Sequence, residues 1–449
     1  MIPYDLPQWI ALLWLFVLGS AFGSFLNVCI YRIPQHENLW QALRSLGTPP
    51  SACPFCKTPI APYDNIPLLG WLNLRGRCRS CKHWIPIRYP AIELLNGLLV
   101  AGLYWLEIPA DFSSSLYHSG VYAHLGPAGV HDSVWLSPQA ILHWRYLYHV
   151  VLIEALVAAT FIDFDLRIIP DGVTLPALAV GVFGATAIGH VHLVPLWFQS
   201  PELLRNFFYV LPESMRWMID VPTVPAWFAA WPHLHGLLVS LAGIVVGGGS
   251  IWIVRIVGHW FFRQEAMGFG DVMLVAMIGS FLGWQASLIV FFLAPACAMV
   301  VVLVSLFFHR NREIPYGPYL ALATVLLLFG WQTIWPIAEP IMGLGPLLPF
   351  VAVFMVVMLI VTLAMVQGIK WIFGIPLFPE EFYEEWTSGD QLFHFAGERH
   401  HAEQLQKTRI QSTWPGELAG KGQLHEQIWK GTVRPLHSPS RGLQQSSKK

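Results

Sequence analysis

Long apolar stretches constrain this chain more than any other feature of its sequence. Several approach or exceed the roughly 20 residues that cross a bilayer as a helix. The composition agrees, since 55% of the residues are hydrophobic, only 12% are charged and the mean hydropathy is +0.52. Many of the 21 tryptophans lie near the ends of these stretches, as in the aromatic belts of membrane proteins. The sequence therefore predicts an all-α polytopic integral membrane protein with about eight to nine transmembrane helices.

The apolar stretches predict helices in this chain order: 8–30, 91–106, 146–164, 172–195, 234–258, one beginning at Asp271, 285–308, 317–335 and 346–372. The first has no basic segment before it and no obvious small-residue cleavage site, so we interpret it as a retained helix. We expect a tight hairpin between the sixth and seventh helices. Gly247-Gly248-Gly249 lies in the fifth helix, where small residues favour close packing against a neighbouring helix.

The distribution of charge predicts the orientation of these helices. The polar segment 32–90 carries eight basic and two acidic residues, and no Lys or Arg precedes the first helix. By the positive-inside rule this segment is cytoplasmic and the N-terminus lies outside. No basic stripe with interleaved aromatics is present, so we expect membrane lipid, and no nucleic acid, as a partner.

Four regions follow from this pattern: a first transmembrane helix in 1–31, a cytoplasmic tetracysteine domain in 32–90, a multi-helix membrane domain in 91–374 and a cytoplasmic tail in 375–449. Within the membrane domain, 107–145 and 196–233 are predicted to be outside loops. The tail has few aliphatic residues, and we expect it to be helical in part at 379–408 and disordered beyond about 410.

Cys53-x-x-Cys56 and Cys78-x-x-Cys81 have the ligand spacing of a zinc ribbon, with 21 residues between the pairs. The turn within each pair lets both sulfurs face one ion. Disulfides or free thiols are the alternative, but stable disulfides are rare in the cytoplasm. Four cysteines fill all four coordination positions, so the sequence predicts a structural zinc ion in a small zinc-ribbon-like domain.

Aspartates at the ends of two apolar stretches are the candidate catalytic groups. Acids at the edge of the hydrocarbon are costly and often mark functional sites, although any one of them could merely end or cap a helix. Asp163 lies furthest into the third helix, and Asp271 follows Gly268-x-Gly270 at a helix entrance. The glycines would let the backbone of an extended substrate come close.

Two carboxylates brought together can hydrolyse a peptide bond. Because their charges repel, one of them retains a proton; the ionised partner activates water and the protonated one donates to the carbonyl oxygen. We predict that Asp163 and Asp271 face each other as this catalytic pair. Asp165 lies nearer water, and Asp171, just after Pro170, is expected to cap the following helix.

Glu154 lies nine positions before Asp163, which places it about 13 Å deeper in the same helix. We interpret it as a structural residue that is protonated, or paired with a polar group that the sequence does not identify.

Further motifs accompany these residues over most of 8–335: Gly23-Ser24-Phe25-Leu26-Asn27-Val28, Tyr31-Arg32-Ile33-Pro34, Asp64-Asn65-Ile66-Pro67 and Arg75-Gly76-Arg77-Cys78 within the Cys53 to Cys81 block, Arg88-Tyr89-Pro90 with Glu93, Asp163 to Pro176, Glu265-Ala266-Met267-Gly268-Phe269-Gly270-Asp271, and Ile314-Pro315-Tyr316-Gly317-Pro318-Tyr319-Leu320-Ala321. In identity and order they resemble bacterial prepilin peptidases, the type IV leader peptidase and N-methyltransferase family of Gly-x-Gly-Asp aspartyl membrane proteases.

The resemblance implies that Asp163 and Asp271 cleave the basic leader of type IV prepilins or type II secretion pseudopilins, at the cytoplasmic face of the bacterial inner membrane. It also implies methylation of the new N-terminal residue with S-adenosylmethionine as the methyl donor. No glycine-rich donor-binding motif is recognisable. Met273 stands where the family commonly has a lysine.

Two other functions fit part of the pattern. Another Gly-x-Gly-Asp intramembrane protease would share the acids but lack the tetracysteine loop. A proton-coupled membrane transporter could use the acids as a relay, with the cysteine loop as a lid. Transporters often contain repeated halves, and no internal repeat is evident in this chain.

Overall fold

The computed structural model describes the following residues: 7–36, 38–47, 51–108, 138–200, 204–206, 212–218, 225, 227–262, 267–307 and 315–373. The long helices in this part of the chain are α1 (Gln8–Arg32), α4 (Arg88–Glu107), α5 (Pro138–Leu166), α6 (Asp171–Ile188), α9 (Pro232–Phe262), α10 (Phe269–Phe307), α11 (Gly317–Phe329), α12 (Trp331–Met342) and α13 (Leu348–Ile372). Shorter ones are η1 (Ile33–Gln35), α2 (Leu39–Ser45), η2 (Pro62–Asp64), α3 (Leu69–Asn73), η5 (Glu213–Met218), α8 (Trp227–Ala230) and η6 (Gly345–Leu347).

Among the described residues, seven helices are long and apolar enough to cross a membrane, and the number is eight if the bent pair α11–α12 counts as one span. Extended structure in the same residues is confined to three isolated bridges. Helices satisfy their own backbone hydrogen bonds, which is what a chain needs in hydrocarbon. The predicted all-α polytopic membrane fold is therefore confirmed.

The helix α10 is interrupted at Gly283, where φ is 81° and ψ is 175°. A Cβ on Gly247 of α9 would lie 3.0 Å from Val275 O and 3.1 Å from Ser287 Cβ. In a straight helix those two residues would be about 18 Å apart. The chain therefore turns back at Gly283, and α10 is the tight hairpin that the sequence predicts after Asp271.

The helix predicted over 317–335 is wrong in its second half. The helix α11 ends at Phe329, and α12 leaves Gly330 at an angle of 98°. Two prolines inside α12, Pro336 and Pro340, cannot donate backbone hydrogen bonds. Trp331 and Trp335 of α12 are buried and stack with ring centroids 4.9 Å apart, so this segment packs sideways instead of extending the span.

Two other boundaries differ from the sequence prediction. The helix α5 begins at Pro138, so 138–145 of the predicted outside loop 107–145 are helical. The helix α6 ends at Ile188, because Gly189 adopts the left-handed conformation (φ 78°) that terminates helices. Residues 109–137 of that loop, much of the predicted loop 196–233, and the tail from 374 lie outside the described residues.

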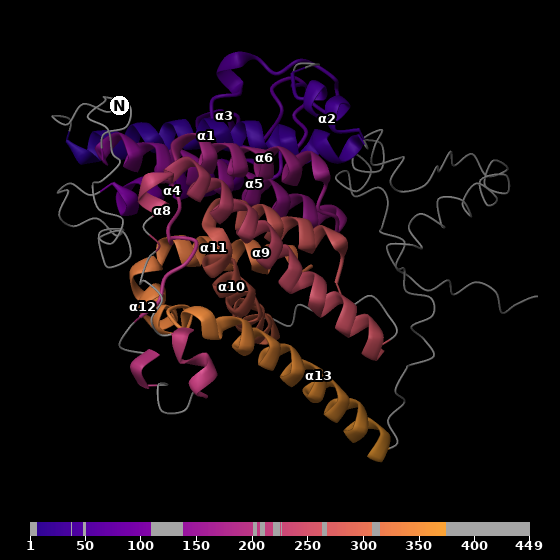
Figure 1. The fold of residues 1–449 in the computed structure, drawn as a ribbon. Helices are drawn as coiled ribbons and strands as arrows, with labels where there is room; N and C mark the ends of the chain where they lie inside the picture. Colours follow the sequence, from indigo (N-terminus) through magenta and orange to yellow (C-terminus); the bar gives the residue numbers. More distant parts are fainter. Residues whose placement is uncertain are drawn as a thin grey trace, which may run out of the picture.

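The helix α5 lies at the centre of the membrane domain. Of an apolar 18-residue stretch of this helix 61% is buried, a larger share than in any other candidate span of the described residues. It contacts α1, α4, α6 and α11. By contrast α13 has no buried residue, and in Figure 1 it lies at the edge of the bundle; near its C-terminal end Gln367 Nε2 donates to Phe261 O of α9 at 3.3 Å. The apolar surface of α13 is therefore suited to lipid.

Glycines bring the backbones of α9 and α10 together. A Cβ on Gly243 would overlap the carbonyl of Gly279, and a Cβ on Gly279 would overlap the carbonyl of Gly243. Gly247 and Gly248 also face α10, whereas a Cβ on Gly249 would meet nothing within 4 Å. The predicted role of the triple glycine in close packing is thus borne by two of its three members, with Gly243 adding the closest approach.

Gly243→Ala should lower the stability of the protein by about 1–3 kcal/mol, because the added methyl group forces α9 and α10 apart. Gly249→Ala is the matched control on the same helix, and its better helix propensity should leave stability unchanged or raise it by up to about 1 kcal/mol. Melting temperatures in detergent measure both effects. Equal melting temperatures for the two variants would contradict this packing.

Candidate functional site

Asp163 and Asp271 come from different helices and meet at one end of the bundle. Asp163 lies in the last turn of α5 and Asp271 in the first turn of α10. Only 4% of Asp163 and 8% of Asp271 is exposed. Their carboxylates are close enough for the negative charge of Asp163 to act on Asp271. The two acids singled out from the sequence thus share one buried site.

Backbone groups hold each of the two carboxylates. The N–H of Gly317, at the start of α11, donates to Asp163, and the N–H of Gly268 donates to Asp271. A Cβ on Gly317 would lie 2.5 Å from Asp163 Oδ2. Position 317 therefore needs glycine so that the backbone can reach the carboxylate.

Ile169, in the link between α5 and α6, covers the same place. A Cβ on Gly270 would lie 3.0 Å from Ile169 Cβ, and a Cβ on Gly317 would lie 3.0 Å from Ile169 Cδ1. Gly270 of the Gly-x-Gly-Asp motif therefore makes room for this link. That the glycines admit a substrate backbone stays a prediction; in the structure Gly270 makes room for the chain's own Ile169.

Tyr316 completes the surroundings of Asp271. Burial, and then the nearby negative charge of Asp271, raise the pKa of Tyr316 to about 12. The phenol therefore keeps its proton at neutral pH. Sequence reasoning did not assign a role to Tyr316 or Gly317, although both lie in the Ile314 to Ala321 motif.

Asp165 and Asp171 are used differently from the pair. Arg88 at the start of α4 donates from Nη1 to Asp165 Oδ1 at 2.6 Å and from Nη2 to Phe161 O at 3.2 Å. Asp165 therefore links α5 to α4. Asp171 is the first residue of α6, but Pro170 occupies the capping position and no side-chain cap bond forms. The predicted cap is wrong. A capping Asp171 would come just before a helix that starts at residue 172, whereas α6 starts at Asp171 itself.

Glu154 has the partner that the sequence did not identify. Asn96 of α4 donates from Nδ2 to Glu154 Oε1 at 2.8 Å and to Gly19 O of α1 at 2.9 Å. One amide group therefore joins three helices in the apolar interior, in agreement with the predicted structural role. The signal was hidden because Asn96 and Glu154 are far apart in the chain.

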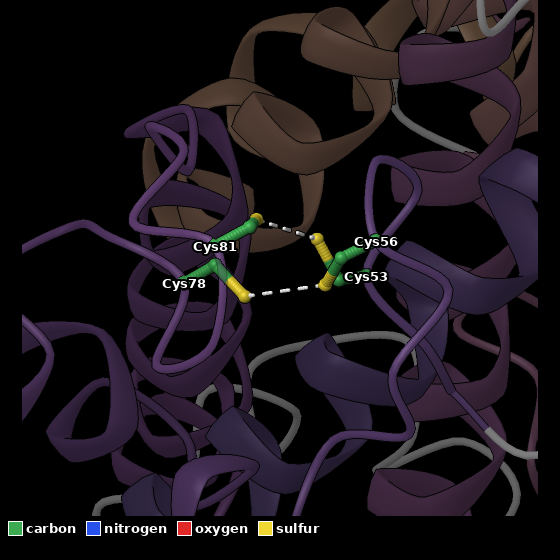
Figure 2. A group of neighbouring side chains, drawn as sticks. All are labelled: Cys53, Cys56, Cys78 and Cys81. Carbon is green, nitrogen blue, oxygen red and sulfur yellow. Dashed lines mark hydrogen bonds between the residues drawn. The ribbon is translucent and has the colours of Figure 1, made fainter.

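The four loop cysteines form one cluster. Their sulfurs all lie within 4.8 Å of one another, and Figure 2 shows the two Cys-x-x-Cys turns facing each other. Cys53 Sγ is 3.7 Å from Cys81 Sγ, and Cys56 Sγ is 3.9 Å from Cys78 Sγ. These separations far exceed the ~2.05 Å of a disulfide bond.

The cluster fits a tetrahedral metal ion. Bonds of ~2.3 Å from zinc to four sulfurs place the sulfurs about 3.8 Å apart, close to the two separations above. Hydrogen bonds from Thr58 lower the pKa of Cys56 to about 6, whereas burial raises the pKa of Cys53 to about 12. A bound dication would favour the thiolate form of all four side chains.

Two family models match this chain. The bacterial peptidase A24 N-terminal domain matches residues 17–106, which include all four clustered cysteines. The type IV leader peptidase family matches residues 221–304, which include Asp271. Asp163 lies between the two matched segments.

Curated relatives extend over most of the chain. The prepilin leader peptidase/N-methyltransferase of Aeromonas hydrophila is 32% identical over 352 residues, which cover 73% of this chain and 93% of the relative. The protein of the same name from Pseudomonas aeruginosa is 30% identical over 341 residues, covering 70% and 89%. That of Neisseria gonorrhoeae is 27% identical over 336 residues, covering 71% and 90%. No solved structure matches the chain.

The matches cover the cysteine cluster, Asp271 and most of the membrane helices, and they follow one order along the chain. On this evidence the chain, a multi-pass membrane protein, belongs to the bacterial prepilin leader peptidase/N-methyltransferase family.

Proposed function

We propose that this protein is an aspartyl endopeptidase that removes the leader peptide from type IV prepilins or type II secretion pseudopilins, and that it methylates the new N-terminus. One observation carries the peptidase proposal: Asp163 and Asp271 lie together in a buried site at one end of the bundle. Family membership supports prepilins as the substrate class.

The chemistry follows from the two carboxylates. One is ionised and takes a proton from a water molecule as it attacks the scissile carbonyl, while the other donates its proton to the carbonyl oxygen. The tetrahedral intermediate then collapses, the C–N bond breaks and a carboxyl group returns the proton to the leaving amine. The Gly317 N–H orients Asp163 for these steps, and the Tyr316 phenol remains a neutral donor beside Asp271.

S-adenosylmethionine would supply the methyl group for the new N-terminus. Within the part of the chain that the structure describes we identify no site for it. Met273, in place of the lysine common in the family, is one turn of α10 beyond Gly270 and thus close to the proposed peptidase site in sequence.

Cys53, Cys56, Cys78 and Cys81 would hold the proposed zinc ion, which would link the two turns structurally. Four sulfurs would fill all four ligand positions, so the ion would have no open position for water and would take no part in hydrolysis.

We further propose the inner membrane as the location, with the N-terminus outside and with the zinc domain and the tail in the cytoplasm. The excess of basic residues in 32–90 supports this orientation. A proton-coupled transporter or a different intramembrane aspartyl protease is less favoured, because the cysteine domain and the family's motif order are then unexplained.

Asp163→Asn and Asp271→Asn should each reduce prepilin cleavage by at least about a hundredfold, because each removes one of the two proton-transfer groups. Asp165→Asn is the matched control two residues away; it weakens a link to Arg88 but should leave measurable activity. The mass of prepilin products, with the purified protein in detergent, reports the rates. Wild-type cleavage by Asp163→Asn would show that the pair is wrongly assigned.

Gly317→Ala should reduce cleavage by about a hundredfold, because the added methyl group would push the Asp163 carboxylate out of its position for proton transfer. Gly249→Ala, whose methyl group meets nothing, should cleave at the wild-type rate. Zinc content and melting temperature of both variants should stay near wild type, which separates a local effect from unfolding. Unchanged cleavage by Gly317→Ala would contradict the proposed contact.

The purified protein should contain one zinc ion per chain, and Cys53→Ser or Cys78→Ser should remove it. Cys297→Ser, in α10 and away from the cluster, should retain the zinc. Elemental analysis of protein purified without chelator measures the content. Metal-free wild-type protein would refute the zinc site while leaving the aspartate pair untouched.

A further inference from the structure

The segment between the two Cys-x-x-Cys turns is tied to the side of the membrane domain. The N–H of Leu68 donates to Glu93 Oε2 of α4 at 2.7 Å, and the hydroxyl of Ser24 in α1 donates to the same carboxylate. Glu93 is only 8% exposed. This buried acid therefore joins α1 and α4 to the chain that leads into α3.

The depth of this attachment is unexpected for a domain outside the membrane. Glu93 lies five residues into α4 from Arg88, or about 8 Å from the helix start. Ser24 lies eight residues before the end of α1 at Arg32, or about 12 Å from it. Leu68 and the start of α3 therefore lie beside the candidate spans α1 and α4, not beyond the ends of these helices.

Specific contacts fix the conformation of this segment. Leu68 has φ 60°, in the left-handed region that side chains disfavour, and its bond to Glu93 compensates for that cost. The indole of Trp71 donates to Ile85 O at 3.0 Å, which joins α3 to the chain just before α4. Gly76, at φ 66°, passes under the Trp71 ring, where a Cβ would lie 2.9 Å from the ring.

Large apolar side chains are exposed on this segment and on the chain between the second Cys-x-x-Cys turn and α4. We call them the α3 face, and its members are Ile66 (46% exposed), Leu69 (56%), Leu72 (59%), Trp84 (57%) and Ile87 (67%). Leu69 and Leu72 are on α3, and Trp84 contacts Trp71 edge-on at 6.4 Å. A domain surrounded by water would rarely expose so many large apolar side chains from so short a stretch.

Basic side chains border the α3 face. Arg75 and Arg77 follow α3 directly and both are exposed. Long basic side chains can lie along apolar surface while their charged ends reach lipid phosphates. Tryptophan is likewise typical of the boundary between hydrocarbon and headgroups. The position beside α1 and α4, the exposed apolar side chains and the flanking basic residues are all features of a surface that contacts lipid.

We propose that the α3 face is embedded in the bilayer, in the leaflet next to the Arg32 and Arg88 ends of α1 and α4, with Arg75 and Arg77 at the phosphates of anionic lipid. The cysteine cluster then lies at the membrane surface, and the inserted α3 face anchors it to the bilayer. Glu93 is the positioning residue that holds the α3 face against α1 and α4.

The test is a photo-crosslink within the intact protein. Leu72, and in a second variant Leu69, is replaced by p-benzoyl-phenylalanine, and the full chain is reconstituted in vesicles of phosphatidylethanolamine and phosphatidylglycerol. Ser80, exposed between the second pair of cysteines, carries the same probe as the matched control. Zinc content of each variant verifies that the domain is folded.

Illumination should give lipid adducts at positions 72 and 69 at several-fold higher yield than at position 80, identified by intact mass. Replacing phosphatidylglycerol with phosphatidylcholine should lower the yield of lipid adducts at position 72. This decrease should be smaller when the same chain also carries Arg75→Gln and Arg77→Gln. Equal yields at 72 and 80, adducts to a second copy of the chain or to added prepilin in place of lipid, or no adduct from a folded variant would each overturn the proposal.

Discussion

Two carboxylates buried side by side are costly, and much of this fold serves to hold them. Asp163 ends the most buried helix, and Asp271 begins the hairpin α10. Asp163 accepts a backbone hydrogen bond from Gly317 and Asp271 accepts one from Gly268. A methyl group added at Gly317 would crowd the Asp163 carboxylate, whereas one added at Gly268 would not crowd Asp271. The site therefore depends on backbone donors at close range, and the positive charge of Arg167 also acts on Asp163.

Polar contacts elsewhere in the bundle connect helices that the chain separates. Arg88 joins the start of α4 to the end of α5 through Asp165, and Asn96 joins α1, α4 and α5 through Glu154. Such bonds specify which helix faces pack together, since apolar contacts alone discriminate poorly in lipid. Because Arg88 and Glu93 are on the same helix, α4 connects the cysteine domain to the helix that carries Asp163.

The cysteine domain and the proposed peptidase site are held by different contacts, although α4 connects them. The proposed zinc ion would fix one turn against another, whereas Glu93 ties the chain before α3 to α4. The proposed hydrolysis uses the two acids and their backbone donors. We expect loss of zinc to affect the cysteine domain first, and loss of either aspartate to affect cleavage alone.

The sequence by itself determined the helical membrane fold, because the length and polarity of an apolar stretch set whether it spans a bilayer. It determined the cysteine cluster, because Cys-x-x-Cys is a local turn, and it selected Asp163 and Asp271 from their depth and the adjacent glycines. Tertiary structure alone decided that Gly317 contacts Asp163, that Asn96 pairs with Glu154 and that Leu68 is fastened to Glu93. The break at Gly330 and the missing cap at Asp171 also escaped prediction. The three contacts join residues remote in the chain, which hydrophobic length and local motif spacing do not encode, whereas the missing cap is local, because Pro170 occupies the capping position.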